Sequence, residues 1–363
     1  MTAAGASVRD VYAGFAGKFV LHPHFQEAEQ AVEQAMRFAG LGDASPCLAI
    51  TGTTGIGKTT LVKKIVAKYP AIPDGRRVLV PGCPDLVTAS VPLLQFEFPP
   101  QATVISVARQ ILQSYGDPKW NRGDRAGLTE RVDLAVGQSG TLALLGDEAQ
   151  RLVDRDGEVR RDDLADWLKE RHSRTGCVVI LVGLGRVVHL LEKDDQIERR
   201  WDSAIRLHPY RWCDPKGKPL REQQADFIGI VSALLDAMPI PVSKELDLEA
   251  DHDLNALRFF YASSGVIGYV TKVLQRALRF ALSDPKQHPE LDLALIEKAF
   301  RAAFRAERYG LENPFAKDWR AYGESGAPNL PPPLKDDTLL LKRPRRRGKH
   351  ERARDLQHAL TLR

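Results

Sequence analysis

Unbroken apolar runs alternate with one-sided apolar patterns along the first two thirds of the chain. The runs at 47–51, 141–145 and 177–182 are almost free of polar residues, which is typical of strands buried in a parallel sheet. Between these runs, at 102–115 and 163–174, apolar residues recur every three or four positions, which predicts helices packed on the sheet. Strands that alternate with helices predict a three-layer α/β/α fold around a parallel sheet.

The pattern changes at about residue 221, after which every periodic segment reads as a helix. Four one-sided apolar stretches predict a small helical bundle. From residue 313 the periodicity is lost, and the proline-rich stretch 328–333 predicts a stiff linker. We therefore divide the chain into an N-terminal arm (1–24), an α/β domain (25–215), a helical domain (216–312), and a linker with a tail (313–363).

The turn after the first apolar run carries a phosphate-binding signature. Residues 52–59 read Gly-Thr-Thr-Gly-Ile-Gly-Lys-Thr and match G-x-x-x-x-G-K-[S/T] at every fixed position, between a predicted strand and a predicted helix. Glycines let backbone N–H groups close around phosphates, and the helix N-terminus adds a favourable dipole. Lys58 would reach the β- and γ-phosphates, and the Thr59 hydroxyl would ligate Mg²⁺. The expected nucleotide contacts are Gly52, Thr53, Thr54, Gly55, Ile56, Gly57, Lys58, Thr59 and Thr60.

Two adjacent acids, Asp147 and Glu148, follow the apolar run at 141–145. A strand that ends in such a pair forms the second half of an NTPase site. Asp147 would join the nucleotide-binding set by holding Mg²⁺, directly or through water, and Glu148 would polarise the attacking water as general base. Lys58 and Asp147 are 89 positions apart, which leaves room for an extra strand and favours the ATPase branch of phosphate-loop proteins. Gly146 departs from the pattern, since an apolar residue is usual there.

Further candidates follow the third apolar run. ATPases of this kind often carry a polar γ-phosphate sensor at that strand end, but Gly183 stands there and Arg186 is the nearest polar side chain. Arg199 and Arg200 end a charged segment just before a predicted edge strand at 204–207. Ring-forming ATPases present an arginine finger to the neighbouring subunit at this place. A solvated helix end remains the alternative for this arginine pair.

A polar loop at 116–125 surrounds Trp120 with cations, among them Lys119 and Arg122. Such cations could contact nucleic-acid phosphates. A solvated loop with the tryptophan tucked into the core explains the same composition, and the sequence does not choose between the two.

Composition narrows the class of protein. Hydrophobic residues make up 43% and charged residues 27% of the 363 residues, a balance typical of globular proteins. No apolar run approaches the roughly 18 residues of a membrane span, and the N-terminus lacks the pattern of a secretory signal. Four widely spaced cysteines without a C-x-x-C pair predict reduced thiols and disfavour a zinc site. We therefore expect a cytoplasmic protein without a membrane partner.

The positive charge is concentrated at the C-terminus. Residues 334–363 hold ten Lys or Arg against four Asp or Glu, a net charge of +6, which leaves the rest of the chain at −1. The basic run at 342–349 predicts a disordered tail that could bind DNA phosphates. A solubilising tail is the alternative.

The order of these parts resembles an AAA+ ATPase: the phosphate loop, the acidic pair, the strand ending at Gly183, the arginine pair and a helical lid. Three further segments, at 99–103, 116–118 and 264–268, make the chain similar to the TniB/TnsC family of transposition regulators over roughly residues 25–282. The resemblance implies an AAA+ P-loop NTPase core with a C-terminal helical lid and a basic tail.

The resemblance also implies a function. Such proteins bind ATP and Mg²⁺, assemble as rings or filaments on duplex DNA, and connect a target-selection protein to the transposase, and hydrolysis disassembles them. By this likeness Thr103, Lys119 and Arg122 would face DNA. The arginine that many AAA+ lids carry near Gly268 is missing, so either Tyr269 or Lys272 would substitute for it or this sensor is absent.

Three alternatives remain open at this stage. A motor or loader of DNA replication or protein remodelling would use the same core. A nucleotide-dependent scaffold without turnover would use only the binding half of the site. The Ser-Ser-Gly turn at 263–265 could also belong to a helix-turn-helix DNA reader instead of a lid.

Overall fold

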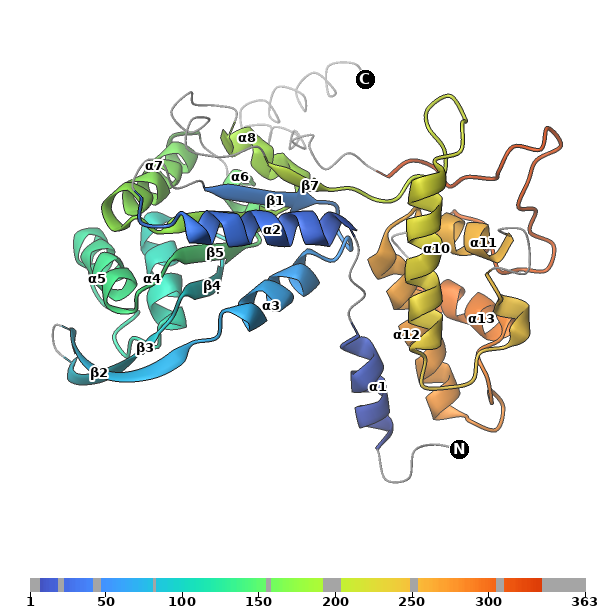
Figure 1. Cartoon of the computed structure of the whole chain (residues 1–363), viewed down its shortest axis with the longest axis horizontal. Helices are drawn as coiled ribbons and strands as arrows, with labels where there is room; N and C mark the ends of the chain where they lie inside the picture. The colour runs from blue at the N-terminus through green and yellow to red at the C-terminus, as the bar shows by residue number, and fades with distance from the viewer. Residues whose placement is uncertain are drawn as a thin grey trace, which may run out of the picture.

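Two bodies make up the described part of the chain, an α/β body built on a parallel sheet and a helical body beside it, as Figure 1 shows. The segment that follows strand β7 joins them. This computed structural model describes residues 7–18, 23–41, 47–80, 83–154, 158–191, 204–248, 254–304 and 310–334.

The central sheet has five parallel strands in the order β4-β5-β6-β1-β7. Every residue of β1, β5 and β6 is buried, as expected for strands covered on both faces. The order places β6 between β1 and β5, so the turns after all three strands meet at one edge of the sheet. The strands are β1 (Leu48–Gly52), β4 (Leu93–Glu97), β5 (Ala143–Asp147), β6 (Val178–Gly183) and β7 (Ile205–Leu207).

Helices cover both faces of this sheet, which confirms the predicted three-layer architecture. Helices α2 (Pro23–Arg37) and α3 (Lys58–Lys68) pack with Ile50, Ile180 and other residues on one face. The other face is covered by α4 (Val104–Ser114), α5 (Arg125–Gln138) and α7 (Glu158–Thr175). Short elements follow the strand ends: α6 (Gln150–Val153), η2 (Gly185–Val187) and α8 (Val188–Leu191).

An antiparallel hairpin of β2 (Ile72–Val80) and β3 (Cys83–Ser90) forms a separate sheet. In the sequence alone, 78–81 and 91–98 are the two strand-like stretches of this region. Residues 78–80 end β2 and the strand β4 lies within 91–98, whereas nothing in the sequence indicated β3. The Pro92 carbonyl accepts hydrogen bonds from the N–H groups of Leu142 and Ala143 at 2.9 and 3.1 Å, and the edge strand β4 begins directly after this proline.

The C-terminal body is helical, as predicted. Its helices are α10 (Arg221–Asp236), α11 (Leu254–Ser263), α12 (Ile267–Ser283) and α13 (Leu293–Ala303), with the short turn η3 (Lys244–Leu246). They enclose one apolar core. No helix in the described ranges is long and apolar enough to cross a membrane.

A helix near the N-terminus also contributes to this helical body. Helix α1 (Val8–Ala16) begins with a capping box, although the sequence pattern assigned it to an N-terminal arm. It buries Phe15 in the apolar core of the helical body, which we call the lid core. The Arg279 guanidinium of α12 donates to the Tyr12 hydroxyl at 2.7 Å. These contacts link residues 267 positions apart, so no local pattern could indicate them.

The lid core also extends beyond the boundary expected at residue 312. Phe315 and Trp319 are buried in it, 1% and 7% exposed. Arg258 of α11 donates to the carbonyl oxygens of Pro314 and Ala316, and its guanidinium lies over the Trp319 ring. The linker region therefore begins as part of the lid.

Candidate nucleotide-binding site

The predicted phosphate loop connects the end of β1 to the first residue of α3. Gly55 and Gly57 have φ angles of 82° and 102°, a left-handed conformation in which most side chains are strained. The Lys58 ammonium donates to the carbonyl oxygens of Gly52 and Thr53 at 2.7 and 2.9 Å. Since no side chain caps α3, its first N–H groups can bind an anion.

Neighbouring elements clamp the tip of this loop. A Cβ atom at Gly57 would lie 2.5 Å from the Phe25 ring of α2, and one at Gly55 would lie 3.0 Å from the Tyr269 ring of α12. A Cβ atom at Gly268 would overlap the Gly55 carbonyl oxygen. The first turn of α12 therefore rests on the phosphate loop, so a ligand of the loop can influence the lid.

The same contacts bear on the helix-turn-helix alternative. Ser263, Ser264 and Gly265 are buried at the junction of the two bodies, and the Gly265 carbonyl accepts a hydrogen bond from the Tyr210 N–H at 3.0 Å. A DNA-reading helix needs an exposed N-terminal turn. In this conformation α12 has the placement of a lid helix. Of the two candidate substitutes for the missing lid arginine, Tyr269 lies on the loop, whereas Lys272 lies over the Phe304 ring.

The predicted acids lie at the end of β5. Asp147 is 8% exposed, and its Oδ1 accepts a hydrogen bond from the Glu148 N–H at 2.8 Å. Burial raises the pKa of Asp147, the Glu148 charge acts in the same direction, and the Lys58 ammonium opposes both. The strands that precede the two motifs, β1 and β5, are separated only by β6 and end at the same edge of the sheet, so the structure brings the two motifs into one site.

Glu148 has a φ of 59°, which is uncommon for a residue with a side chain. Such backbone strain persists where the surrounding structure holds it, often at functional sites. Here the hydrogen bond to Asp147 and the contacts of the Glu148 carboxylate described below hold the turn.

The oxygen atoms of Asp147 and Thr59, at the edge of the sheet where β1 and β5 end, are suitable ligands for a magnesium ion. Asp147 offers a buried carboxylate whose charge is costly without a cation, and Thr59 offers an exposed hydroxyl at the start of α3. Oxygen atoms of these types are the ligands that Mg²⁺ prefers. When bound, the ion would neutralise phosphate charge.

Asp147→Asn should therefore weaken Mg²⁺-dependent ATP binding while it raises the melting temperature of the nucleotide-free protein. The substitution removes a charge that burial disfavours, and such changes at functional sites stabilise by about 0.5–2 kcal/mol, or roughly 2–4 °C per kcal/mol. Differential scanning fluorimetry without ligand and with Mg²⁺-ATP measures both effects. Asp154→Asn, an exposed control, should not raise the melting temperature. A lower melting temperature for Asp147→Asn would contradict this account.

The structure explains the unexpected glycine before the acids. A Cβ atom at Gly146 would overlap the Phe98 ring and lie 2.9 Å from the Phe96 ring. These two rings pack edge to face with centroids 4.9 Å apart. An apolar side chain is absent at this position because two aromatic side chains already fill the space.

Two residues that the sequence interpretation missed contact Glu148 from the short helix α6. Gln150 donates through Nε2 to the Glu148 carboxylate. Arg151 lies with Nε 4.0 Å from the same carboxylate, pairs with Glu97 at 2.7 Å and donates to the Phe98 carbonyl. The sequence signal that could have identified these two residues is their position directly after the acidic pair. Arg186, the sensor candidate from the sequence, instead pairs with Asp154 at 2.6 Å.

The predicted DNA contacts lie at opposite ends of α4. Thr103 caps the helix and accepts a hydrogen bond from the Ser106 N–H at 3.0 Å, while Lys119 and Arg122 follow the helix. Eleven helical residues separate the two ends by roughly 16 Å at about 1.5 Å per residue. The structure therefore does not bring the three side chains together within one chain.

Apolar packing, an ion pair and a hydrogen bond hold the loop after α4 in place. Trp120 packs against the core, Asp117 pairs with Arg131, and the Lys119 N–H donates to Asp117 at 2.7 Å. Arg122 is exposed. The tryptophan is thus half-buried against the core, close to the simpler interpretation, and the Lys119 side chain is also half-buried. The arginine-finger candidates Arg199 and Arg200 lie outside the described residues, as does the basic run at 342–349.

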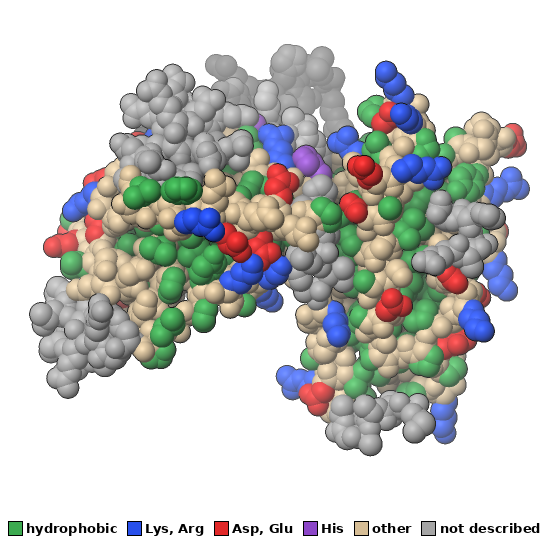
Figure 2. Space-filling view, viewed as in Figure 1, with side chains coloured by type: hydrophobic (Ala, Val, Ile, Leu, Met, Phe, Trp, Pro, Cys, Tyr) green, Lys and Arg blue, Asp and Glu red, His purple; other side chains and the backbone are tan. Residues whose placement is uncertain are grey.

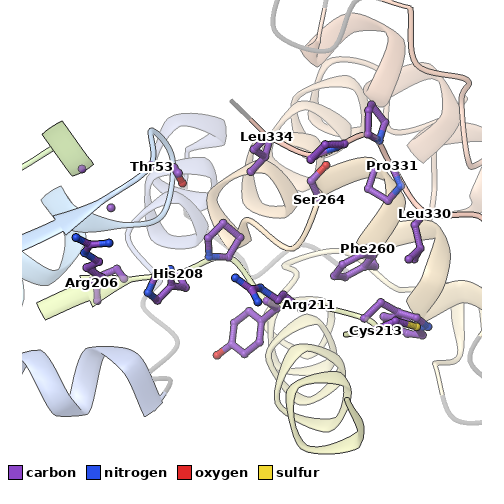
Figure 3. A pocket seen from close by; sticks show the side chains of 18 of the residues that line it. Thr53, Arg206, His208, Arg211, Cys213, Phe260, Ser264, Leu330, Pro331 and Leu334 are labelled. Carbon is purple, nitrogen blue, oxygen red and sulfur yellow. The ribbon is translucent and has the colours of Figure 1, made fainter. Parts of the chain in front are cut away.

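A cavity of about 600 Å³ adjoins the start of the phosphate loop, as Figure 3 shows. Thr53 and Arg206 from the α/β body, His208 and Arg211 from the connecting segment, and the stretch 330–334 line it. The hydroxyls of three lining residues, Thr51, Thr53 and Ser264, have no hydrogen-bond partner among the residues described. Leu334, where the basic tail begins, lines the same cavity as Thr53 of the phosphate loop.

Comparisons with known proteins agree with this geometry. Residues 43–191 match a family model described as an AAA domain. No curated protein matches the sequence. The crystal structure of Cdc6p from Pyrobaculum aerophilum is similar over 83% of this chain and 72% of its own, with 14% identity and a TM-score of 0.54. The ORC1 protein of Aeropyrum pernix, solved in complex with DNA, is similar over 82% and 70%, with 15% identity and a TM-score of 0.53. The chain thus has the AAA+ P-loop NTPase fold with a helical C-terminal region, and residues 43–191 match the AAA domain.

Proposed function

We propose that this protein is an ATP-dependent, DNA-binding regulator of transposition of the TniB/TnsC type. In this role it oligomerises on duplex DNA and links target selection to the transposase, and ATP hydrolysis drives disassembly. The observation that carries the proposal is the meeting of the Lys58 loop with Asp147 and Glu148 at one edge of the sheet. The resemblance of the segments at 99–103, 116–118 and 264–268 to the TniB/TnsC family supports the finer assignment to transposition.

In the proposed reaction the Lys58 ammonium binds the β- and γ-phosphates from its position over the loop. Thr59 and Asp147 would hold Mg²⁺. Glu148 accepts a proton from the water that attacks the γ-phosphate. Arg199 or Arg200 of a neighbouring copy would complete the charge around the transferred phosphoryl group, which would make the nucleotide a bond between subunits.

The separation of the DNA-binding candidates suits a duplex that runs along α4. Roughly 16 Å corresponds to about five base pairs at about 3.4 Å per base pair. Arg151 connects the segment before Thr103 to Glu148, because it contacts Glu97, the Phe98 carbonyl and the Glu148 carboxylate. DNA bound at Thr103 could thereby change the placement of the general base.

A replication initiator or loader is the second candidate. The likeness to Cdc6p and to ORC1 favours it, and the ORC1 structure contains DNA. A loader would act at chosen DNA or move along it, whereas the proposed regulator would coat duplex DNA of any sequence. Strand-displacement assays and footprinting separate the two.

The main test combines electron microscopy with DNA binding. Wild-type protein, random-sequence duplex and a non-hydrolysable ATP analogue should give rings or filaments, and omission of the nucleotide should abolish them. Solitary molecules under every nucleotide condition would overturn the proposal.

A double substitution, Lys119→Ala with Arg122→Ala, should weaken DNA binding in the same way for all sequences. Each phosphate contact contributes about 0.9 to the slope of log affinity against log salt, so the slope should fall by roughly 1.8. Fluorescence anisotropy over a salt series measures it. Lys286→Ala, which removes an exposed lysine from the lid, should leave the slope unchanged. An unchanged slope in the double variant would remove this loop from the DNA surface.

A further inference from the structure

The end of strand β6 and the acid Glu148 are bridged by one side chain, Gln150. It is 8% exposed and belongs to α6, the short helix after the acidic pair. Its Nε2 donates to Glu148 Oε2, and its Oε1 accepts a hydrogen bond from the Leu184 N–H at 3.1 Å. The Ala149 N–H donates to the Val182 carbonyl at 2.9 Å and ties the start of α6 to the same strand.

The chemistry of these partners fixes the orientation of the amide. The Leu184 N–H can only donate, so it requires the amide oxygen. The amide NH₂ must then point to Glu148, whose ionised carboxylate can only accept. The bridge therefore holds the Glu148 side chain through Oε2 and leaves Oε1 outside this hydrogen bond.

Glycine at position 183 makes room for this bridge. A Cβ atom there would lie 2.8 Å from Gln150 Oε1 and 3.0 Å from the Gln150 backbone nitrogen. It would also lie 2.8 Å from the buried Val187 side chain. The glycine at the end of β6 thus leaves the space that the Gln150 side chain occupies.

We propose that Gln150 is the positioning residue of the hydrolytic site. It holds Glu148 for proton abstraction and supplies, from α6, the polar group that the end of β6 lacks. The inference rests on the proposed ATP hydrolysis, which it deepens. Arg186 has no part in it, because its guanidinium is paired with Asp154.

Steady-state ATPase kinetics of Gln150→Ala and Gln150→Glu test the proposal. A displaced general base should lower kcat by about 10–100-fold, as small misplacements of reacting groups do. KM for ATP should stay within about twofold, since Gln150 touches Glu148 and not the phosphate loop. Gln150→Glu keeps the side-chain length but replaces the NH₂ donor by a carboxylate that faces Glu148. Arg186→Ala, at the same strand end, is the matched control and should keep the wild-type kcat.

A double-substitution cycle excludes a merely structural effect. In a Glu148→Gln background, Gln150→Ala should lower the residual rate no further, because the two residues act as one unit. Binding of a fluorescent ATP analogue with wild-type affinity shows that each variant is folded.

Two outcomes would overturn the inference alone, given that Glu148→Gln hydrolyses ATP about 10²–10⁴ times more slowly than the wild type. These are a wild-type kcat for both Gln150 variants, or an equal loss with and without Glu148. Wild-type protein that never turns over ATP would overturn both the inference and the proposed hydrolysis.

Discussion

Glu148→Gln should bind ATP with wild-type affinity and hydrolyse it about 10²–10⁴ times more slowly, the usual contribution of a general base. Glutamine keeps the size and shape of the side chain but cannot take a proton from water. The hydrogen bond from the N–H of residue 148 to Asp147 does not depend on the carboxylate, and the amide oxygen of glutamine can still accept the hydrogen bond from Gln150. The substitution should therefore remove the chemistry without disturbing the site.

The same variant should remain assembled on DNA once ATP is bound, because hydrolysis is the proposed route to disassembly. Phosphate release measures the rate, and electron microscopy with ATP measures the lifetime of the assemblies. Asp163→Asn is the matched control, since Asp163 is an exposed carboxylate paired with Arg125 away from the acids. A Glu148→Gln protein that hydrolyses ATP at the normal rate would exclude Glu148 as the base.

The parts of the molecule that were predictable from the sequence depend on local pattern. The apolar runs at 47–51, 141–145 and 177–182 correspond to β1, β5 and β6, and the last lies centrally, as a fully apolar strand should. The short strand at 204–207 takes the edge. Because parallel strands end at one edge of the sheet, the motifs after them had to meet there.

The parts that were missed depend on contacts between distant residues. Gln150 reaches Leu184 over 34 positions, and neither residue has a periodicity that indicates the other. The unexpected glycines at 146 and 183 were visible, but the side chains that occupy their space were not. The hydrogen bond of α1 to α12, and the aromatic residues after residue 312 that complete the lid core, were hidden for the same reason.

Interlocking contacts around the phosphate loop join the lid to the nucleotide site. Gly55 meets Tyr269 and Gly268 of the lid, and Gly57 meets Phe25 of α2. A nucleotide that enters the loop must therefore displace or use these neighbours. This would couple nucleotide binding to the angle between the two bodies, and so to the surfaces that neighbouring copies share.

Lys58→Ala should lower the affinity for ATP by about 100-fold or more. Hydrogen bonds to charged groups contribute about 1.5–3 kcal/mol each, and Lys58 would contact two phosphates. The substitution should also abolish nucleotide-dependent assembly on DNA. Isothermal titration calorimetry measures the affinity, and co-sedimentation with duplex DNA measures assembly. Lys63→Ala makes the same charge change on an exposed position of the same helix α3 and should bind ATP normally.

Three results of this experiment are possible. If Lys58→Ala still assembles only when ATP is present, the nucleotide does not act through this loop. Should it assemble equally without ATP, the ammonium would be a brake on assembly instead of a sensor of nucleotide. The proposed function requires the third result, in which the Lys58→Ala protein stays unassembled with or without ATP while the Lys63→Ala protein behaves as wild type.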